Sequence, residues 1–315
     1  MKKLVLTFAM LGLCVLGGCG QKASQGPKST DVDKIKTLKI GVMPSTDNMP
    51  LVIAHEQGID QKHNVSIELA TFKSARDRDA AFQAGSLEGI NADLVGIATY
   101  LEGGMDLKIT SATFGQFDLI GNDQVKSLAD LVGQELVILK NQGPQYAAEA
   151  LLKKAGFSGE DVQMIEVPQV PSRVELLNNH QAGAAILPEP FVTMSLAEGM
   201  HTLGSTREMG MNPFVLCFTK EVIESKAEAL KGMYAAYNEA VDWMKEHDQA
   251  EYIQLFIDAV GFPEALADKI VVPDYPYASQ VTEKDILEAF DWAKEHQLFT
   301  QRVTPKDVLS DVYFK

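Results

Sequence analysis

LKIGVMPSTDNMPLVIAHEQGI, residues 38–59, reads as a strand, a short polar loop and a helix in immediate succession. Leu38 to Val42 is an apolar run with β-branched residues, and residues 45–48 are short hydrogen-bonding side chains. From Pro50 to Gly58 the spacing of apolar residues changes to a helical one. A strand followed at once by a helix is the repeating unit of a parallel sheet covered by helices, so this stretch predicts an α/β protein.

The same alternation continues along the chain in two consecutive sets. The first set predicts strands at 38–42, 65–70, 89–93 and 108–113, with helices at 50–58, 75–85 and 98–103. The second set predicts strands at 135–139, 162–167, 184–187 and 201–203, with helices at 144–155, 173–183 and 190–199. A length of 315 residues and a hydrophobic content of 46% are sufficient for two modest cores. We therefore expect two lobes, each built on a mainly parallel sheet.

The helices that follow residue 219 are expected to be packing elements. Ser225 and Glu228 form a capping-box pattern, which predicts that a helix begins there. Thr282 and Asp285 predict the start of another helix. Since the apolar residues of both helices share one face, we expect Trp292 and the other aromatic residues to belong to the core.

The N-terminus has the features of a secretory signal. Two lysines precede an apolar run from Leu4 to Leu16, which is about thirteen residues long, fewer than the roughly twenty that a membrane-spanning helix needs. The run ends in Leu16-Gly17-Gly18-Cys19, which resembles the bacterial lipobox. This resemblance implies that residues 1–18 are a signal peptide and that Cys19 is lipidated. Residues 20–33 are small and polar, so we expect residues 19–35 to be a flexible tether and the protein to be extracytoplasmic, anchored to the cell membrane by lipid.

Cysteine usage and charge exclude several other arrangements. Cys14 is expected to leave with the signal and Cys19 to carry lipid, so Cys217 cannot form an internal disulfide in the mature protein. Cys217 lies in an apolar run, residues 214–218, that predicts a buried strand and a structural thiol. The chain has 28 Lys and Arg against 43 Asp and Glu, a net charge of −15, and shows no basic stripe. We therefore do not expect nucleic acid as a partner.

Several segments together resemble one known family. They are residues 39–59, the helix-to-strand step at 80–89, the segment 127–134, and Leu187-Pro188-Glu189-Pro190-Phe191. Their order resembles that of the ABC-transporter solute-binding lipoproteins for nitrate, sulfonates, taurine and thiamine-pyrimidine precursors, the NitT/TauT and NMT1/THI5-like family. The resemblance implies a type II periplasmic-binding-protein fold, with lobe I at 36–116 plus 215–315, lobe II at 117–214, and crossovers near 115–119 and 212–218.

The resemblance also implies a function. It implies the solute-binding component of an ABC importer, monomeric, which captures an aminopyrimidine, a taurine or alkylsulfonate, or nitrate, and delivers it to a permease. Two alternatives stay open: a solute-sensing lipoprotein that feeds a signalling receptor, and an enzyme of pyrimidine biosynthesis on the same fold.

No motif in the sequence indicates catalysis, a cofactor or a metal. His55-Glu56 begins like a zinc-protease helix, but the second His four residues on is absent. There is no Gly-x-Ser-x-Gly elbow, no phosphate-binding Gly-Lys-Ser/Thr loop and no Gly-x-Gly-x-x-Gly. The six His show no ligand spacing. We therefore expect a protein that is not an enzyme and that has neither cofactor nor metal.

Candidate ligand-binding residues follow from one rule: in open parallel sheets, ligands bind beyond the carboxyl ends of the strands. Applied to the predicted strands, the rule selects Ser45, Thr46, Asp47, Asn48, Asn91, Asp93, Thr113, Phe114, Asn141, Gln142, Gly143, Tyr146, Glu189 and Phe191. Residues 45–48 are equally suited to cap the following helix without any ligand. Arg76 and Arg78 could meet an anion, although solvated pairs with Asp77 and Asp79 are the simpler interpretation. The excess of acidic side chains in these loops, with aromatic residues for stacking, favours a zwitterionic, neutral or weakly cationic nitrogen compound over nitrate.

Overall fold

The computed structural model describes residues 35–310 and 313 of the 315-residue chain. The predicted signal peptide, the lipidated Cys19 and most of the predicted tether lie outside the described residues. No helix among residues 35–310 is long and apolar enough to cross a membrane.

The first of two sheets contains β1 (Lys36–Val42), β2 (Val65–Thr71), β3 (Gly89–Asp93), β4 (Leu107–Ala112) and β10 (Phe214–Thr219). Their order is β2-β1-β3-β10-β4. Strands β2, β1 and β3 are parallel, whereas β10 is antiparallel to both of its neighbours. We call this sheet and the helices packed on it lobe I.

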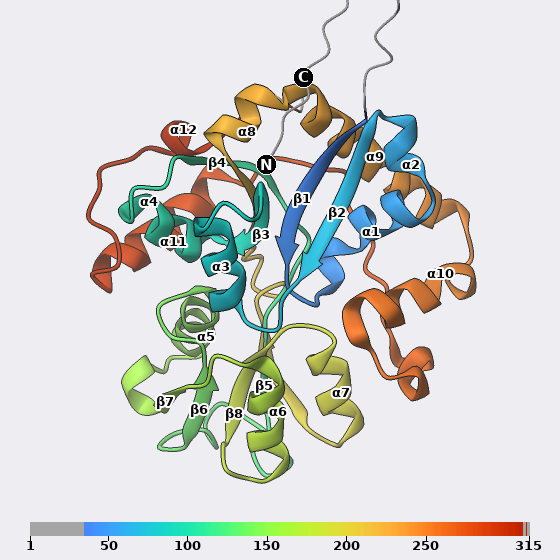
Figure 1. Cartoon of the computed structure of the whole chain (residues 1–315). Helices are drawn as coiled ribbons and strands as arrows, with labels where there is room; N and C mark the ends of the chain where they lie inside the picture. Colours follow the sequence, from blue (N-terminus) through green and yellow to red (C-terminus); the bar gives the residue numbers. More distant parts are fainter. Residues whose placement is uncertain (1–34, 311–312, 314–315) are drawn as a thin grey trace, which may run out of the picture. The chain divides into compact units, whose positions relative to one another are not determined.

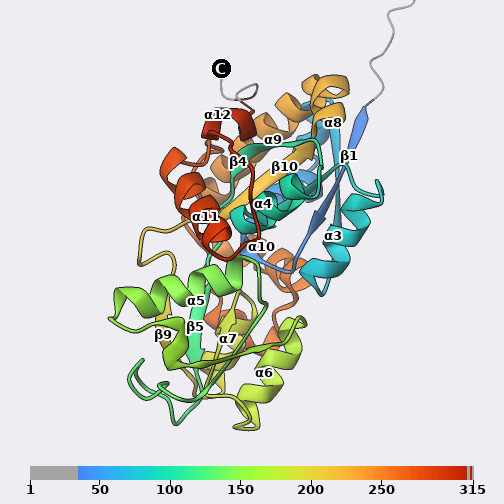
Figure 2. The same ribbon diagram turned by 90° about the vertical axis from the view of Figure 1, so that its left-hand side faces the viewer.

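The second sheet repeats this arrangement. It contains β5 (Asp118–Gly121), β6 (Glu135–Ile138), β7 (Gln163–Glu166), β8 (Ala184–Leu187) and β9 (His201–Ser205). Their order is β7-β6-β8-β5-β9, and here β5 is the antiparallel strand. We call this sheet and its helices lobe II; its elements gather at the lower end of Figures 1 and 2.

In each lobe, the antiparallel strand is the first strand that the chain forms after it arrives from the other lobe. The chain leaves β4 in lobe I and enters lobe II as β5, and it leaves β9 in lobe II and returns to lobe I as β10. The prediction of two mainly parallel sheets joined by two crossovers is confirmed. The sequence pattern did not predict β5 as a strand, because only two of its residues, Leu119 and Ile120, are apolar and they stand between Asp118 and Gly121.

Helices connect the strands and cover both sheets (Figures 1 and 2). Lobe I carries α1 (Met49–Glu56), α2 (Ile59–Lys62), α3 (Ala75–Gln83), α4 (Leu94–Glu102), α8 (Lys220–Ser225), α9 (Ala227–Glu246), α10 (Gln249–Phe256), α11 (Glu283–Glu295) and α12 (Pro305–Val308). Lobe II carries α5 (Gly143–Lys154), α6 (Val170–Asn178) and α7 (Phe191–Ala197). Short helical turns lie at η1 (Thr46–Asn48), η2 (Gly159–Asp161), η3 (Ile257–Gly261) and η4 (Glu264–Lys269).

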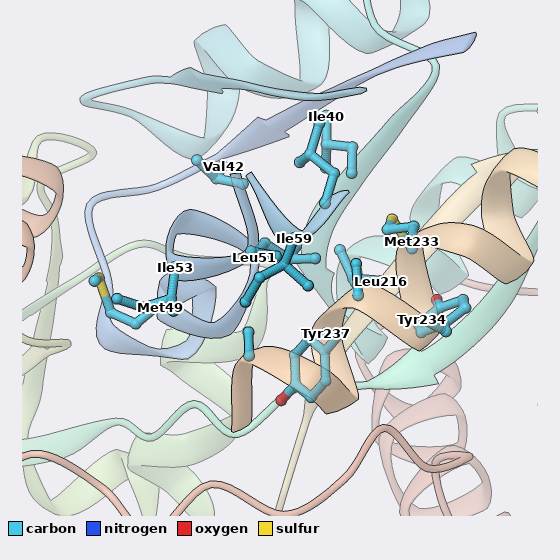
Figure 3. Packing of buried hydrophobic residues seen from close by; sticks show 14 of the residues in the cluster. Ile40, Val42, Met49, Leu51, Ile53, Ile59, Leu216, Met233, Tyr234 and Tyr237 are labelled. Atoms are coloured by element: carbon cyan, nitrogen blue, oxygen red, sulfur yellow. The ribbon is translucent and has the colours of Figure 1, made fainter. Parts of the chain in front are cut away.

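Four buried clusters lie on the two faces of the two sheets. Strand β10 shows the division: Leu216 and Phe218 pack in the cluster with β1, α1 and α9, whereas Val215 and Cys217 pack in the cluster with α4 and α11. Figure 3 shows Ile59, Leu216 and Met233 gathered between the sheet and α9. The two faces of the lobe II sheet carry the other clusters in the same alternating way. Since side chains of a strand point alternately to opposite faces, a strand covered on both sides reads as a continuous apolar run, as residues 214–218 do.

One predicted helix start is wrong, and one is confirmed. Ser225 does not cap the long helix α9, because it is the last residue of α8 and its hydroxyl donates to the Glu221 carbonyl at 2.7 Å. Thr282 does cap α11, where its side chain accepts from the Asp285 N–H. Cys217 is buried and free, as expected.

Strand β10 lies close to β3 at Gly89, where there is no room for a side chain. A Cβ on Gly89 would lie 2.7 Å from the carbonyl oxygen of Cys217 and would overlap the Phe218 ring. We predict that Gly89→Ala lowers the free energy of unfolding by about 1–3 kcal/mol, because backbone cannot move aside cheaply. The measurement is urea unfolding, with Gly103→Ala as control, since a Cβ there meets its nearest atom at 3.4 Å. Equal unfolding midpoints for the two variants would contradict the packing described.

Candidate functional site

A cavity of about 70 Å³ lies between the two lobes. It is lined from lobe I by Met43, Ser45, Asp47, Asn48, Ala75, Arg78, Asn91, Ala92 and Asp93, from the crossovers by Phe117 and Phe214, and from lobe II by Leu139, Gln142, Pro144, Pro168, Val170, Arg173 and Pro188. These residues follow the carboxyl ends of β1, β2, β6, β7 and β8 or stand at the end of β3. A mostly apolar wall with a few polar groups is typical of a small-molecule site.

The lobe I wall is organised around the Asp47 carboxylate. Asp47 lies in η1, and only 2% of its surface is exposed. Its Oδ2 accepts hydrogen bonds from Asn91 Nδ2 at 2.7 Å and from Thr113 Oγ1 at 2.8 Å. Asn91 Nδ2 also donates to Asn48 Oδ1 at 2.7 Å, which fixes the amide. The polar loop is therefore a built hydrogen-bonding network and not only a helix start, since η1 and α1 have no side-chain cap.

The lobe II wall contacts lobe I through two other carboxylates, those of Asp93 and Asp79. Gly143 N–H donates to Asp93 Oδ1 at 2.9 Å, and Gln142 Nε2 donates to Asp79 Oδ2 at 3.0 Å. Asp93 Oδ1 also accepts from Gly96 N–H, which caps α4. A Cβ on Gly143 would lie 2.6 Å from the Asp93 Cγ. The lobes can therefore meet here only because residue 143 has no side chain.

Two arginines stand at equivalent places in the two lobes. Arg78 is the fourth residue of α3 and Arg173 the fourth of α6, each in the helix that follows the edge strand of its sheet. Arg78 Nη1 donates to the Asn91 carbonyl in β3 at 2.6 Å, and Arg173 Nη1 to the Ile186 carbonyl in β8 at 3.0 Å. Both side chains line the cavity.

The two arginines differ in their counter-charge. Arg78 pairs with the Asp79 carboxylate at 2.7 Å, and both groups are buried. Burial acts to lower the pKa of Arg78, but its electrostatic interactions with Tyr100 and Asp79 outweigh burial and raise the pKa. The interpretation of a solvated pair is therefore wrong for Arg78. Arg76, by contrast, is exposed and pairs with Glu166 of lobe II, outside the cavity.

Arg173 is not among the residues predicted from the sequence. The strand-end rule selects loops after other strands, and the sequence predicts that the helix begins at residue 173, whereas α6 begins at Val170. Extending the rule to the second strand of each set selects both arginines. Burial lowers the pKa of Arg173 to about 10, which leaves the guanidinium protonated at neutral pH.

The structure brings six predicted site residues together at the cavity: Ser45, Asp47, Asn48, Asn91, Asp93 and Gln142. Thr113 and Gly143 lie behind the wall and hold Asp47 and Asp93 through their hydrogen bonds. These eight remain predicted ligand-binding or supporting residues.

The other six predicted residues lie away from the cavity. Thr46 and Glu189 line a surface groove of about 460 Å³ with Asp118 and Arg207, and Asn141 lines another surface groove near His296. Tyr146 packs on Trp292 with ring centroids 5.6 Å apart, and Phe191 packs against a lobe II cluster. The Arg207 guanidinium carbon lies over the Phe114 ring, 4.2 Å from the centroid of that ring. These six residues lie elsewhere because the rule gives the edge of the sheet but not the direction in which a side chain points.

Arg207 connects the two crossovers and belongs to the wider groove. Its Nη2 donates to the Phe114 carbonyl at 3.2 Å. Burial raises the pKa of both Asp118 and Glu189 and lowers that of Arg207. The groove is larger than the cavity and rich in charge of both signs. Because both sheets direct their strand ends into the cavity, the cavity is the stronger candidate site.

Two sheets, each with one antiparallel strand that follows a crossover and with a small cavity between them, define the fold of the two-lobed periplasmic solute-binding proteins. The chain belongs to the NMT1-like family, whose model matches residues 32–122 and 137–257.

Individual relatives are more distant. Over 200 residues the chain is 26% identical to a protein of Brucella abortus that is named only as a binding protein, and the alignment covers 61% of each chain. Over 217 residues it is 27% identical to a Vibrio cholerae protein named "Probable D-methionine-binding lipoprotein MetQ". This alignment covers 62% of this chain and 72% of the Vibrio protein. The alkanesulfonate-binding protein SsuA of Xanthomonas axonopodis pv. citri, bound to MOPS, matches with a TM-score of 0.72 at 17% identity over 87% of this chain and 98% of that one. The last likeness confirms the fold.

The Asp93 carboxyl gives a pH-dependent prediction. Burial raises the pKa of Asp93. The hydrogen bond from Gly96 N–H lowers this pKa, but by less than burial raises it. A carboxyl with a raised pKa binds more protons in the folded state, so its contribution to the free energy of unfolding falls as pH rises through its unfolded pKa of about 3.9. We predict that Asp93→Asn, which can still accept both N–H groups, gains stability relative to the wild type as pH rises from about 3.5 to neutral.

The check is denaturant unfolding at several pH values, with Asp77→Asn as the exposed control. A difference between wild type and Asp93→Asn that stays constant across this range, or changes in the opposite sense, would contradict the assigned burial.

Proposed function

We propose that the chain is the extracytoplasmic solute-binding component of an ABC importer, anchored to the membrane through lipid on Cys19. It captures a small nitrogen- or sulfur-containing organic solute between its lobes and delivers it to a permease. Binding and release require no covalent chemistry. Family membership supports this proposal, and so does the fold.

The observation that carries the proposal is the small cavity between the lobes. Both sheets direct their strand ends into it, and its polar groups come from both lobes. One buried water needs about 10–15 Å³, so a cavity of about 70 Å³ has room for only a few waters or a small molecule. This size favours a small solute over a peptide or a polymer.

The names of similar proteins support a chemical range for the solute. The names of the similar proteins mention an alkanesulfonate, MOPS and D-methionine. These are small organic molecules with sulfur, and MOPS and methionine also contain nitrogen. We therefore propose the aminopyrimidine, taurine or alkylsulfonate, and nitrate classes as the starting range, with amino acids added.

Contacts that cross between the lobes suggest how binding is signalled. Glu149 of α5 accepts from Trp292 Nε1 of α11 at 2.8 Å, and Arg76 of α3 pairs with Glu166 of β7. Together with the Gly143 and Gln142 contacts, these bonds form only when the lobes meet. A solute that contacts both lobes favours this closed arrangement by its extra affinity for it, and the closed arrangement is what a permease can recognise.

A ligand screen tests the proposal. We expect at least one compound among taurine, alkylsulfonates, nitrate, aminopyrimidines and amino acids to release heat on titration and to raise the Tm. At a concentration 100 times the Kd, binding stabilises the folded state by about 2.7 kcal/mol. The absence of heat and of a thermal shift with every class would contradict the proposal.

A glycine substitution tests the role of lobe contact. Because a Cβ at residue 143 would collide with Asp93 across the cleft, Gly143→Ala should weaken solute binding at least tenfold while changing the unfolding midpoint little. Titration calorimetry and urea unfolding measure the two effects. Gly159→Ala is the matched control on lobe II, since the nearest atom to a Cβ there is 3.4 Å away. Unchanged affinity in Gly143→Ala would mean that lobe contact is not needed for binding.

A further inference from the structure

Two buried oxygen atoms at the cavity accept no hydrogen bond from any described residue. They are Asp47 Oδ1 and Gln142 Oε1. The only other such atoms among the described residues are two hydroxyls, Ser195 Oγ and Tyr313 Oη, outside the cavity lining. A buried acceptor without a donor costs free energy, so two of them in one small cavity call for an explanation. A ligand with N–H or O–H donors supplies one.

Both oxygens are held in place by the bonds of their neighbouring atoms. Asp47 Oδ2 is engaged by Asn91 and Thr113, so the carboxylate cannot turn Oδ1 toward another partner without losing these bonds. Gln142 Nε2 donates to Asp79 Oδ2, which fixes which end of the amide is the free oxygen. The two atoms therefore present fixed acceptors, one from each lobe.

The charge of Asp47 sharpens the requirement. Asp47 has no cation within 4.0 Å among the described residues, and Arg207, which interacts with it electrostatically, is also shared with Asp118 and Glu189. A buried carboxylate is costly unless it is paired. A ligand group that donates hydrogen bonds and carries positive charge satisfies both needs, and a protonated amine does so.

The opposite charge is unpaired on the lobe II side. The Arg173 guanidinium is 2% exposed and donates to three backbone carbonyls: those of Val167 at 2.8 Å, Ile186 at 3.0 Å and Pro168 at 3.4 Å. No carboxylate of the described residues lies within 4.0 Å of it, although the equivalent Arg78 has Asp79. A guanidinium has five N–H groups, so three carbonyl bonds leave donors as well as charge for an anion.

We infer that the solute is a small zwitterion, with a protonated amine at Asp47 Oδ1 and Gln142 Oε1 and an anionic group, carboxylate or sulfonate, on the side of Arg173. This inference rests on the proposed function and narrows it. Nitrate and unsubstituted alkylsulfonates lack the amine, and simple aminopyrimidines lack the anion. The amine contacts both lobes, so it contributes directly to closure.

Titration calorimetry with matched probes tests the inference. The probes are taurine, β-alanine and the twenty standard amino acids, together with ethanesulfonate and propionate, which lack the amine, and ethylamine, which lacks the anion. Nitrate and an aminopyrimidine complete the panel. We expect one or more zwitterions to bind, and the analogues that lack either charge to bind at least 100-fold more weakly.

Variants assign the two charged ends. Asp47→Asn can keep its bonds to Asn91 and Thr113 while turning the free acceptor into an N–H donor. It should weaken zwitterion binding by about 10- to 150-fold, the loss expected for a hydrogen bond to a charged group, and should weaken ethanesulfonate or propionate binding much less. Arg173→Met should weaken zwitterion binding by a similar factor, and Arg173→Lys, which keeps the charge, should restore part of it. Exposed Asp77→Asn and Arg302→Met are the controls, and unfolding midpoints check that each variant folds.

The outcomes separate the inference from the proposed function. Binding of nitrate, ethanesulfonate or an aminopyrimidine as tight as that of any zwitterion would overturn the inference and leave the proposed function in place. Zwitterion affinity unchanged by both Asp47→Asn and Arg173→Met would overturn it in the same way. If no probe binds, the proposed function fails and the inference fails with it.

Discussion

The chain crosses twice between the two sheets, and each time it enters the new sheet antiparallel to the strands on either side. Strand β5 pairs antiparallel with β8 and β9, and strand β10 pairs antiparallel with β3 and β4, so each sheet contains one antiparallel strand, the first one after a crossover. Because every other strand of both sheets runs the opposite way, the carboxyl ends of β1, β3, β6 and β8 all face the gap between the lobes. The cavity follows from this pairing, as does the collection of its polar side chains from five separate parts of the sequence.

The same pattern of strand order in both lobes explains the paired arginines. In each lobe, the helix after the edge strand places an arginine at its fourth position, where the guanidinium donates to a carbonyl of the third strand. One change distinguishes them: residue 79 is an aspartate and residue 174 is a valine. The first arginine is therefore neutralised within the protein, and the second keeps its charge at the cavity wall. Together with Asp47, this gives the cavity one unpaired group of each sign, from opposite lobes.

Much of the fold could be predicted from the sequence, because buried parallel strands read as short apolar runs between helical segments. Strands β3 and β8 have the predicted bounds, 89–93 and 184–187. Strand β5 could not be found, since its position depends on pairing with β8 and β9, far along the chain. The capping box at Ser225 failed because α8 reaches this residue first, which the local pattern does not show.

Part of the candidate site could be predicted, because the position of a loop at the edge of a sheet depends only on the order and direction of the strands. The strand-end rule depends on topology alone, so it selected Asp47, Asn91, Asp93 and Gln142 correctly as neighbours. Side-chain direction depends on packing: Tyr146 turns toward Trp292, and Phe114 lies under Arg207. The aromatic residues that do line the cavity, Phe117 and Phe214, come from the crossovers and contact each other with centroids 4.5 Å apart.

A crystal structure of the protein with a bound solute shows whether the solute binds where the strand ends of both sheets meet. We predict density for the solute in the inter-lobe cavity, with solute atoms within hydrogen-bonding distance of both Asp47 and Gln142. Density in the groove beside Glu189 and Arg207 instead, or solute contacts with one lobe alone, would mean that this cavity is not the binding site.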